Sequence, residues 1–358
     1  MPYERNQIGS VYMQMEINIE NKTEQPFISI AIASYNYGRY LDRAIQAIAR
    51  QKFKDFEVVY LDDASTDDSV EIIQKIIMSY PDIQIRLIQN RVNEGILNSK
   101  TKLIKECRGE YVMLCDADDW MADDCLEVLA ETAKKEGADR VICEVADIDE
   151  KGRCIQIQDI PQEPSRWLWN LNHGCLYRRS ILTDNSIVIQ FEPDDVNLTT
   201  EFNKYTDKVS WVRRTLYYWM VHEDSSGRAV TQETYEQSQG EFGKMTEYLK
   251  MTRSQMDSKK DKEEIELLAM KLYYLFLFHT MKNYGLKSKL RQYRRVRQIM
   301  RDNFPGYLGA PALKLSKKAI RSYAYNIISF SVLLEKMRLF VPAYIGYHLV
   351  SKVHYFDQ

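Results

Sequence analysis

The chain has 358 residues, of which 45% are hydrophobic and 28% are charged. This composition is typical of a globular protein, excludes a disordered or fibrous chain, and leaves room for one large domain and a smaller one. The formal net charge of −2 is unevenly divided, because residues 280–358 carry +12 and residues 1–279 carry −14. We therefore expect the two parts to meet different partners.

Strands and helices alternate in the first part of the chain. A continuous apolar run predicts a buried strand at 27–33, and further strands are predicted at 56–61, 83–88, 111–115 and 140–145. Apolar residues at helical spacing follow the first four strands, at 41–48, 70–77, 97–107 and 126–135. Ser65 or Thr66 can cap the second of these helices. The alternation predicts an α/β fold with a mostly parallel sheet, whose ligands bind beyond the carboxyl ends of the strands.

The rest of the chain follows other patterns. Residues 150–230 are less regular, and from about residue 232 the spacing is helical, with no strong strand. We expect a polar N-terminal leader (1–25), a catalytic domain (26–230) and a helical, basic C-terminal region (231–358).

The six cysteines include no C-x-x-C pair, which argues against a zinc ribbon and favours a reducing compartment. Residues 1–24 lack the apolar core of a secretory signal. The longest uncharged runs near the C-terminus have 13 residues, fewer than the roughly 20 that span a bilayer. These features predict a cytoplasmic protein.

Three carboxylates follow the fourth predicted strand in the segment CDADDW. Asp116, Asp118 and Asp119 lie within four residues, so their mutual repulsion favours compensation by a cation. Oxygen ligands suit Mg²⁺ or Mn²⁺, which keep open positions for substrate phosphates. The alternative is a solvated acidic turn before the helix that begins near Ala122.

A second acidic segment, LDDASTDDS, follows the second predicted strand. Asp62 and Asp63 end that strand, where a carboxylate can accept a hydrogen bond from a nucleobase or a ribose hydroxyl. Asp67 and Asp68 favour the N-terminus of the next helix instead.

Several motifs together resemble a known family. The segments ISIAIASYNYGRYLDRAIQAIARQKFKDFEVVYLDDASTDDS, NEG (93–95), RGEYVMLCDADDW and HGCLYRRSIL occur in the order and spacing of family 2 glycosyltransferases. The resemblance covers about residues 27–225. It implies the GT-A fold, an inverting metal-dependent reaction, a nucleotide-sugar donor such as a UDP-sugar, and a role in bacterial surface-polysaccharide assembly.

The resemblance also implies a donor site. Ala33 and Tyr35 would line the nucleobase pocket, and Asp62 and Asp63 would bind uracil or its equivalent. The other donor-binding residues that it implies are Asn93, Gly95, Lys100, Asp116 and Asp118. Lys100 departs from the family, which often has arginine there, because it keeps the positive charge but loses the bidentate fork.

The resemblance assigns Asp118 and Asp119 to the metal, which would be Mn²⁺ or Mg²⁺. His222, in WMVHEDSSG, would contact the metal or the diphosphate, and the alternative is a locally bonded loop histidine. His173 lies near the acceptor or is part of a structural turn.

The family places an acidic catalytic base after these motifs. Asp194 and Asp195 in FEPDDVNL match it, with Asp195 as the first choice for the general base that deprotonates the acceptor hydroxyl. The alternative is the N-terminus of a helix after Pro193.

The C-terminal region is basic. Seven basic residues and no acid lie from Lys287 to Arg301, in a pattern that predicts an amphipathic helix. Such a helix can contact an anionic membrane surface at the inner face of the cell membrane, where a lipid-linked saccharide acceptor would lie. It can also pack on the core or form a homo-oligomer. No recognised nucleic-acid module is present.

Two other functions are compatible with the fold. A non-catalytic nucleotide-sugar-binding or assembly protein is favoured by Lys100 and Thr101, although the intact acidic cluster argues against it. A nucleotidyltransferase would need a glycine-rich phosphate loop after the first strand, where the segment SYNYGRY supplies only Gly38.

Overall fold

The computed structural model describes residues 13–15, 25–222, 232–280, 285–309 and 322–353. The chain forms two compact units, each assembled from separate stretches of sequence. The first unit comprises residues 1–158, 173–189 and 208–220, and the second comprises residues 159–172, 190–207 and 221–358. The predicted leader lies mostly outside the described residues, and the predicted domain boundary near residue 230 stays a prediction.

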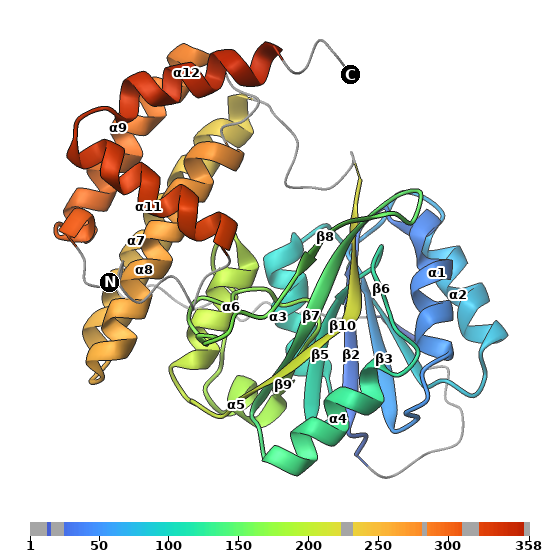
Figure 1. The fold of residues 1–358 in the computed structure, drawn as a ribbon. Coiled ribbons are helices and arrows are strands. Elements are labelled where there is room, and N and C mark those ends of the chain that lie inside the picture. Colours follow the sequence, from blue (N-terminus) through green and yellow to red (C-terminus); the bar gives the residue numbers. More distant parts are fainter. Residues whose placement is uncertain (1–12, 16–24, 223–231, 281–284, 310–321, 354–358) are drawn as a thin grey trace, which may run out of the picture. The chain divides into compact units, whose positions relative to one another are not determined.

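The described residues of the first unit form a ten-stranded sheet (Figure 1). Its order is β1-β4-β3-β2-β5-β9-β7-β10-β6, with β8 paired to β7. The strands are β1 (Met13–Met15), β2 (Ile28–Ser34), β3 (Phe56–Asp62), β4 (Ile85–Gln89), β5 (Tyr111–Asp116), β6 (Trp120–Met121), β7 (Arg140–Asp149), β8 (Cys154–Gln158), β9 (Cys175–Arg178) and β10 (Val209–Val221).

The sheet is parallel in its middle and antiparallel toward its sides. Strands β4, β3, β2 and β5 run parallel, as the alternating pattern predicts. The pairs β1–β4, β5–β9, β7–β9, β7–β8 and β10–β6 are antiparallel. The expected mostly parallel sheet is therefore a mixed one, because further strands pair antiparallel on both sides of the parallel group.

Helices cover both faces of this sheet (Figure 1). They are α1 (Gly38–Ala49), α2 (Ser69–Ser79), α3 (Ile96–Glu106), α4 (Cys125–Glu136) and α5 (Arg179–Asp184). Every residue of β2 and β3 is buried, which explains their largely apolar sequences. Apolar side chains of α1, α2 and α4 pack with alternate residues of β2, β3 and β5 in one core. This core fixes the ends of the parallel strands, where the candidate site residues lie.

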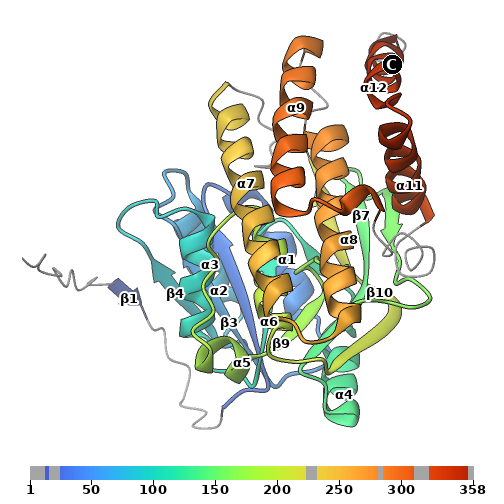
Figure 2. The same cartoon turned by 90° about the vertical axis from the view of Figure 1, so that its left-hand side faces the viewer.

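The second unit is helical (Figure 2). Its helices are α6 (Asp194–Asn203), α7 (Gln232–Gln255), α8 (Lys259–Leu275), α9 (Leu286–Asn303), α11 (Ser322–Lys336) and α12 (Phe340–Val353), with a π-helical turn at Phe276–Thr280 and a 3₁₀ turn at Tyr307–Gly309. Buried side chains of α7, α8, α9, α11 and α12 form its own hydrophobic core. Among the described residues, no helix has both the length and the apolarity needed to cross a membrane.

One buried carboxylate joins three elements of the second unit. The Glu335 side chain on α11 is fully buried and accepts hydrogen bonds from the hydroxyls of Tyr273 (2.8 Å) and Tyr307 (2.7 Å). It also accepts one from Arg297 Nε of α9, at 3.0 Å. Three charge-assisted hydrogen bonds to one buried acid hold α11 against α8 and α9.

Replacing Glu335 with alanine should therefore destabilise the second unit. The change leaves two tyrosine hydroxyls and the Arg297 guanidinium without their acceptor, at a cost of about 3 kcal/mol in the free energy of unfolding. Urea denaturation followed by circular dichroism measures this loss. The matched control is Glu247→Ala, since Glu247 is exposed on α7, and an equal effect of both changes would contradict the anchoring role.

Candidate active site

The acidic cluster begins with Asp116, the last residue of β5. Asp116 is the parallel register partner of Ala33 on β2, so it lies at the carboxyl end of the sheet, as predicted. Its Oδ1 lies 3.2 Å from Nζ of Lys100, which α3 holds in a buried position. Burial favours the protonated form, but the Lys100 ammonium and the hydrogen bond with His173 outweigh it, and the pKa of Asp116 lies well below its usual range.

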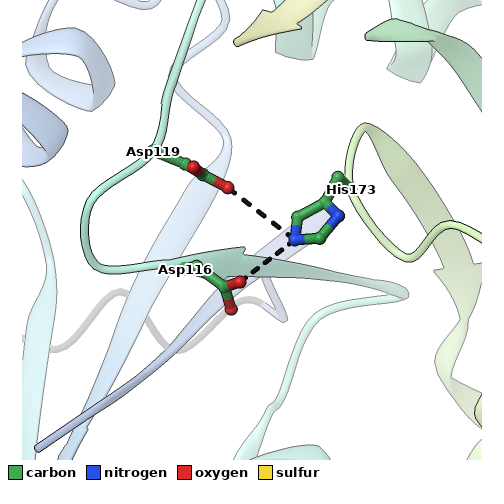
Figure 3. Close-up of side chains that lie close together, drawn as sticks. All are labelled: Asp116, Asp119 and His173. Atoms are coloured by element: carbon green, nitrogen blue, oxygen red, sulfur yellow. Dashed lines mark hydrogen bonds and ion pairs between the residues drawn. The ribbon is translucent and has the colours of Figure 1, made fainter. Parts of the chain in front are cut away.

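His173 lies between two carboxylates (Figure 3). Its Nε2 is 3.0 Å from Asp116 Oδ2 and 3.8 Å from Asp119 Oδ2. The ring stacks on Trp219, with centroids 5.6 Å apart. The following residue, Gly174, has a φ of +65°, and a Cβ there would lie 2.6 Å from the Cys143 sulfur. A glycine is required at this turn, which places the imidazole against the acidic cluster.

Asp119 is the most deeply buried acid of the cluster, with no exposed side-chain surface. It accepts hydrogen bonds from the Tyr217 hydroxyl (2.8 Å) and the backbone N–H of Met220 (2.9 Å), both on β10. Burial raises the pKa of Asp119 well above its usual range, and the nearby Asp116 and Asp118 raise it further, while His173 opposes them. The long strand β10 therefore completes a site that β5 begins.

Asp118 is buried next to Arg43 of α1. The Arg43 guanidinium donates a hydrogen bond to the Asp118 carbonyl oxygen at 2.9 Å and lies over the Trp120 ring, 4.1 Å from its centroid. Burial lowers the pKa of Arg43, and the negative charges of Asp118 and Asp119 oppose that shift. Arg43 thus supplies positive charge next to Asp118 and Asp119, and its role here was not predicted.

Asp62 and Asp63, at the end of β3, both form hydrogen bonds within the protein. Asp63 accepts hydrogen bonds from the backbone of Glu94 (2.9 Å) and Gly95 (2.9 Å) and from the Asn90 side chain (2.7 Å). Asp62 is 1% exposed, and its Oδ2 accepts a hydrogen bond from the Ser65 backbone. Burial raises the pKa of Asp62. Asp63 therefore holds the turn that contains Asn93 and Gly95, and a direct contact of either acid with a nucleobase stays a prediction.

The turn between β3 and α2 differs from the prediction. Helix α2 begins at Ser69 with Asp68 at the cap position, so a cap at Ser65 or Thr66 is wrong. Asn36 binds this turn instead, since its Oδ1 accepts from the Thr66 N–H at 2.7 Å and its N–H donates to Ser65 Oγ at 2.9 Å. Beside it, Tyr35 is 41% exposed at the strand end, where a planar ligand can stack on it.

Three predicted residues belong to the second unit. Asp194 and Asp195 form the first turn of α6, after Pro193, so the alternative of a helix N-terminus is observed. Asp195 Oδ1 accepts a hydrogen bond from the Asn172 N–H at 3.0 Å. His222 is buried, and the residues that follow it lie outside the described part of the chain. The catalytic and metal-binding roles of these residues stay predictions.

Asp116, Asp119 and His173 are able to hold a metal ion. One ligand atom from each residue lies within 4.8 Å of the others. The sequence assigned Asp119 to a metal and placed His173 near the acceptor or in a structural turn. His173 could not be assigned as a ligand because it is 57 residues from Asp116, and only the antiparallel pairing of β9 with β5 brings the two together.

The sequence model of the family Glycosyl transferase family 2 matches residues 29–187, which include Asp116, Asp119 and His173. Residues 29–187 form a family 2 glycosyltransferase domain. The protein EpsH of Bacillus subtilis, named as a glycosyltransferase, is 23% identical over 290 residues, 75% of this chain and 82% of EpsH. The chain spans 40%, 16% and 43% of the length of three further curated relatives.

Solved structures have the same fold as this glycosyltransferase. TarS 1–349 of S. aureus in complex with UDP-GlcNAc has a TM-score of 0.63 at 18% identity, over 90% of this chain and 91% of that one. The mannosyltransferase PcManGT of Pyrobaculum calidifontis, in complex with GDP-Man and Mn²⁺, has a TM-score of 0.52 at 13% identity, over 92% and 88%. The expected GT-A-like fold with a helical C-terminal region is confirmed.

Replacing Asp63 with alanine should release the turn at residues 93–95 of the glycosyltransferase. The Glu94 N–H loses its acceptor, and the Gly95 N–H keeps only the Asn93 side-chain oxygen, at 3.0 Å. Hydrogen exchange should therefore accelerate about tenfold or more at Glu94 and by less at Gly95. Exchange measured by NMR tests this. Asp68→Ala changes a nearby acid whose side chain caps nothing in α2. Unchanged protection of both amides in Asp63→Ala would contradict the anchoring of the turn.

Proposed function

We propose that the enzyme transfers a sugar from a nucleotide-diphosphate sugar, such as a UDP-sugar, to a saccharide or lipid-linked saccharide hydroxyl with inversion of configuration. The observation that carries this proposal is the convergence of Asp116, Asp119, His173 and Lys100 at the end of β5. Carboxylates at the carboxyl end of the sheet are suited to bind a cation, which in turn binds the diphosphate of the donor.

Mn²⁺ or Mg²⁺ fits the donor set of the first unit. Two carboxylates and an imidazole within 4.8 Å are ligands that Mn²⁺ accepts, so Asp116, Asp119 and His173 would hold it. The family resemblance adds Asp118 and His222 as candidate ligands. When bound, the ion neutralises charge on the leaving diphosphate as a Lewis acid.

Residues of this chain prepare the donor site without the ion. Lys100 keeps Asp116 ionised and brings a positive charge that a diphosphate can also meet. Asp63 orders the turn of Asn93 and Gly95. Ala33 at the end of β2 and the exposed Tyr35 ring provide a surface for the nucleobase.

The proposed reaction is a single displacement. The acceptor oxygen forms a bond to the anomeric carbon while the bond from that carbon to the diphosphate oxygen breaks, and Asp195 takes the hydroxyl proton. The half-buried position of Asp195 at the start of α6 supports this role, because a carboxylate there is favoured by the helix N-terminus and remains within reach of solvent. Asp194 is the second choice for the base.

Membrane contact is a separate proposal that a different surface supports. Phe330 and Leu333 of α11, and Met337 just after it, are 61%, 51% and 57% exposed, next to Lys336 and Arg338. Protruding apolar residues with neighbouring cations suit an anionic bilayer surface. Flotation of the full chain with vesicles that contain anionic lipid tests this contact, and Phe330→Asp with Leu333→Asp should abolish it. Unchanged flotation of that double variant would contradict it.

Removing one proposed ligand should weaken metal binding. Asp116→Asn and His173→Asn should each reduce the affinity for Mn²⁺ by about tenfold or more. Electron paramagnetic resonance of free Mn²⁺ measures the affinity on the full chain. The control is Asp123→Asn, an exposed acid bound to Arg50. Wild-type affinity in both ligand variants, with loss in His222→Asn, would move the ion to the site that the family resemblance implies.

Asp195→Asn should separate donor binding from transfer. The amide keeps the acceptor oxygen for the Asn172 N–H but cannot take a proton, so transfer should fall by about 10²–10⁴-fold while donor affinity is unchanged. Release of nucleoside diphosphate measures the rate, and calorimetry measures donor binding. Asp194→Asn tests the second choice for the base in the same way. Wild-type turnover in Asp195→Asn would exclude Asp195 as the base.

A further inference from the structure

Helix α9 presents a row of cations to solvent. The side chains of Lys287, Arg291, Arg294 and Arg295 are exposed, and together with Leu290 they line an open surface groove. Spacings of four, seven and eight residues place them on one helix face, about 6 Å apart for each helical turn. This set of four cations is called the α9 cationic groove below.

The charges of the α9 cationic groove are not compensated within the described part of the chain. None of its four cations forms an ion pair there, and α9 contains no acid before Asp302, whose carboxylate accepts from Gln298. Arg297 of the same helix differs from these four cations, because it forms an ion pair with the buried Glu335. Four exposed cations held together on one helix repel one another, so they favour an anionic ligand.

The other face of α9 decides which anionic partner fits. Tyr293, Val296 and Met300 are buried in the core of the second unit, so the apolar face of this amphipathic helix is not available to lipid. The groove itself carries one partly buried leucine and no protruding aromatic or aliphatic side chain. An interfacial helix binds by inserting such side chains, and α9 does not offer them.

We propose that the α9 cationic groove binds a soluble, extended anionic polymer that carries repeated phosphate or carboxylate groups. Three of the four cations are arginines, whose planar forks bind these anions through paired hydrogen bonds. A polymer with repeated anionic groups can contact all four cations at once, whereas a single small anion contacts only one or two of them. The charge of −14 on residues 1–279 repels such a polymer and restricts it to the basic region. This inference rests on the proposed function: the groove holds the growing polysaccharide chain that accepts the sugar.

Binding of long-chain inorganic polyphosphate to the full protein tests the groove. Arg291→Glu with Arg295→Glu should weaken binding by about tenfold or more, since two attractions become repulsions. The matched control, Lys250→Glu with Lys259→Glu, makes the same charge change on α7 and α8 outside the groove and should leave the affinity nearly unchanged. Inorganic phosphate should bind far more weakly than the polymer. Circular dichroism checks that the variants are folded. Arg291→Gln with Arg295→Gln removes the two charges without reversing them and should weaken polyphosphate binding less.

Two results would overturn the proposal. Equal loss in the groove variant and in its control would mean that net charge alone attracts the polymer. Loss of flotation with anionic vesicles in the groove variant, with polyphosphate binding unchanged, would make the groove a membrane contact. Calorimetry of nucleotide-sugar binding without polymer reports on the donor site alone. Donor binding should be unchanged in the groove variant, whereas its absence from the wild-type protein would refute the proposed function and not the groove.

Discussion

Mutual repulsion among Asp116, Asp118 and Asp119 at the end of β5 is the constraint on which the first unit depends. Asp116 is ionised beside Lys100 and His173, and Asp119 is buried under Tyr217 and Met220. The compensating groups come from three separate parts of the unit, since Lys100 lies on α3, His173 precedes β9, and Tyr217 and Met220 lie on β10. The antiparallel strands of the sheet are therefore as necessary to the acidic cluster as the parallel ones.

This arrangement explains how a family 2 glycosyltransferase domain can keep a negative site before its substrate binds. Lys100 and His173 compensate the negative charge of Asp116, and burial disfavours the negative charge on Asp119. An incoming cation would replace the partial compensation by His173 with a full divalent charge. Because the same residues set the charge and the geometry, a change in one of them affects both.

The sequence was sufficient to predict the parallel strands and the acids that follow them. Their sequences are mostly apolar, as is typical of buried parallel strands. It was not sufficient for β9 and β10, whose sequences lack a clean alternation, or for His173, which becomes a neighbour of Asp116 only through strand pairing. Asp63 was predicted as a ligand residue, but its bonds to a distant turn depend on where α3 begins.

Helix α9 illustrates a different limit of sequence patterns. Its amphipathic period was predicted correctly, yet the same period describes a helix on a membrane and a helix packed on a protein core. The burial of Tyr293, Val296 and Met300 assigns its apolar face to the core of the second unit. The groove on its charged face is then a consequence of packing, and its partner must be inferred from charge and shape.

The central claim is that the acids after β5 bind a divalent ion that carries the donor diphosphate. A crystal of the full chain grown with Mn²⁺ and UDP, measured at a wavelength where manganese scatters anomalously, tests it directly. The account predicts an anomalous peak in contact with Asp116, Asp119 or His173 and with a diphosphate oxygen. UDP bound at this sheet edge without any such peak, or a peak remote from these acids, would contradict it.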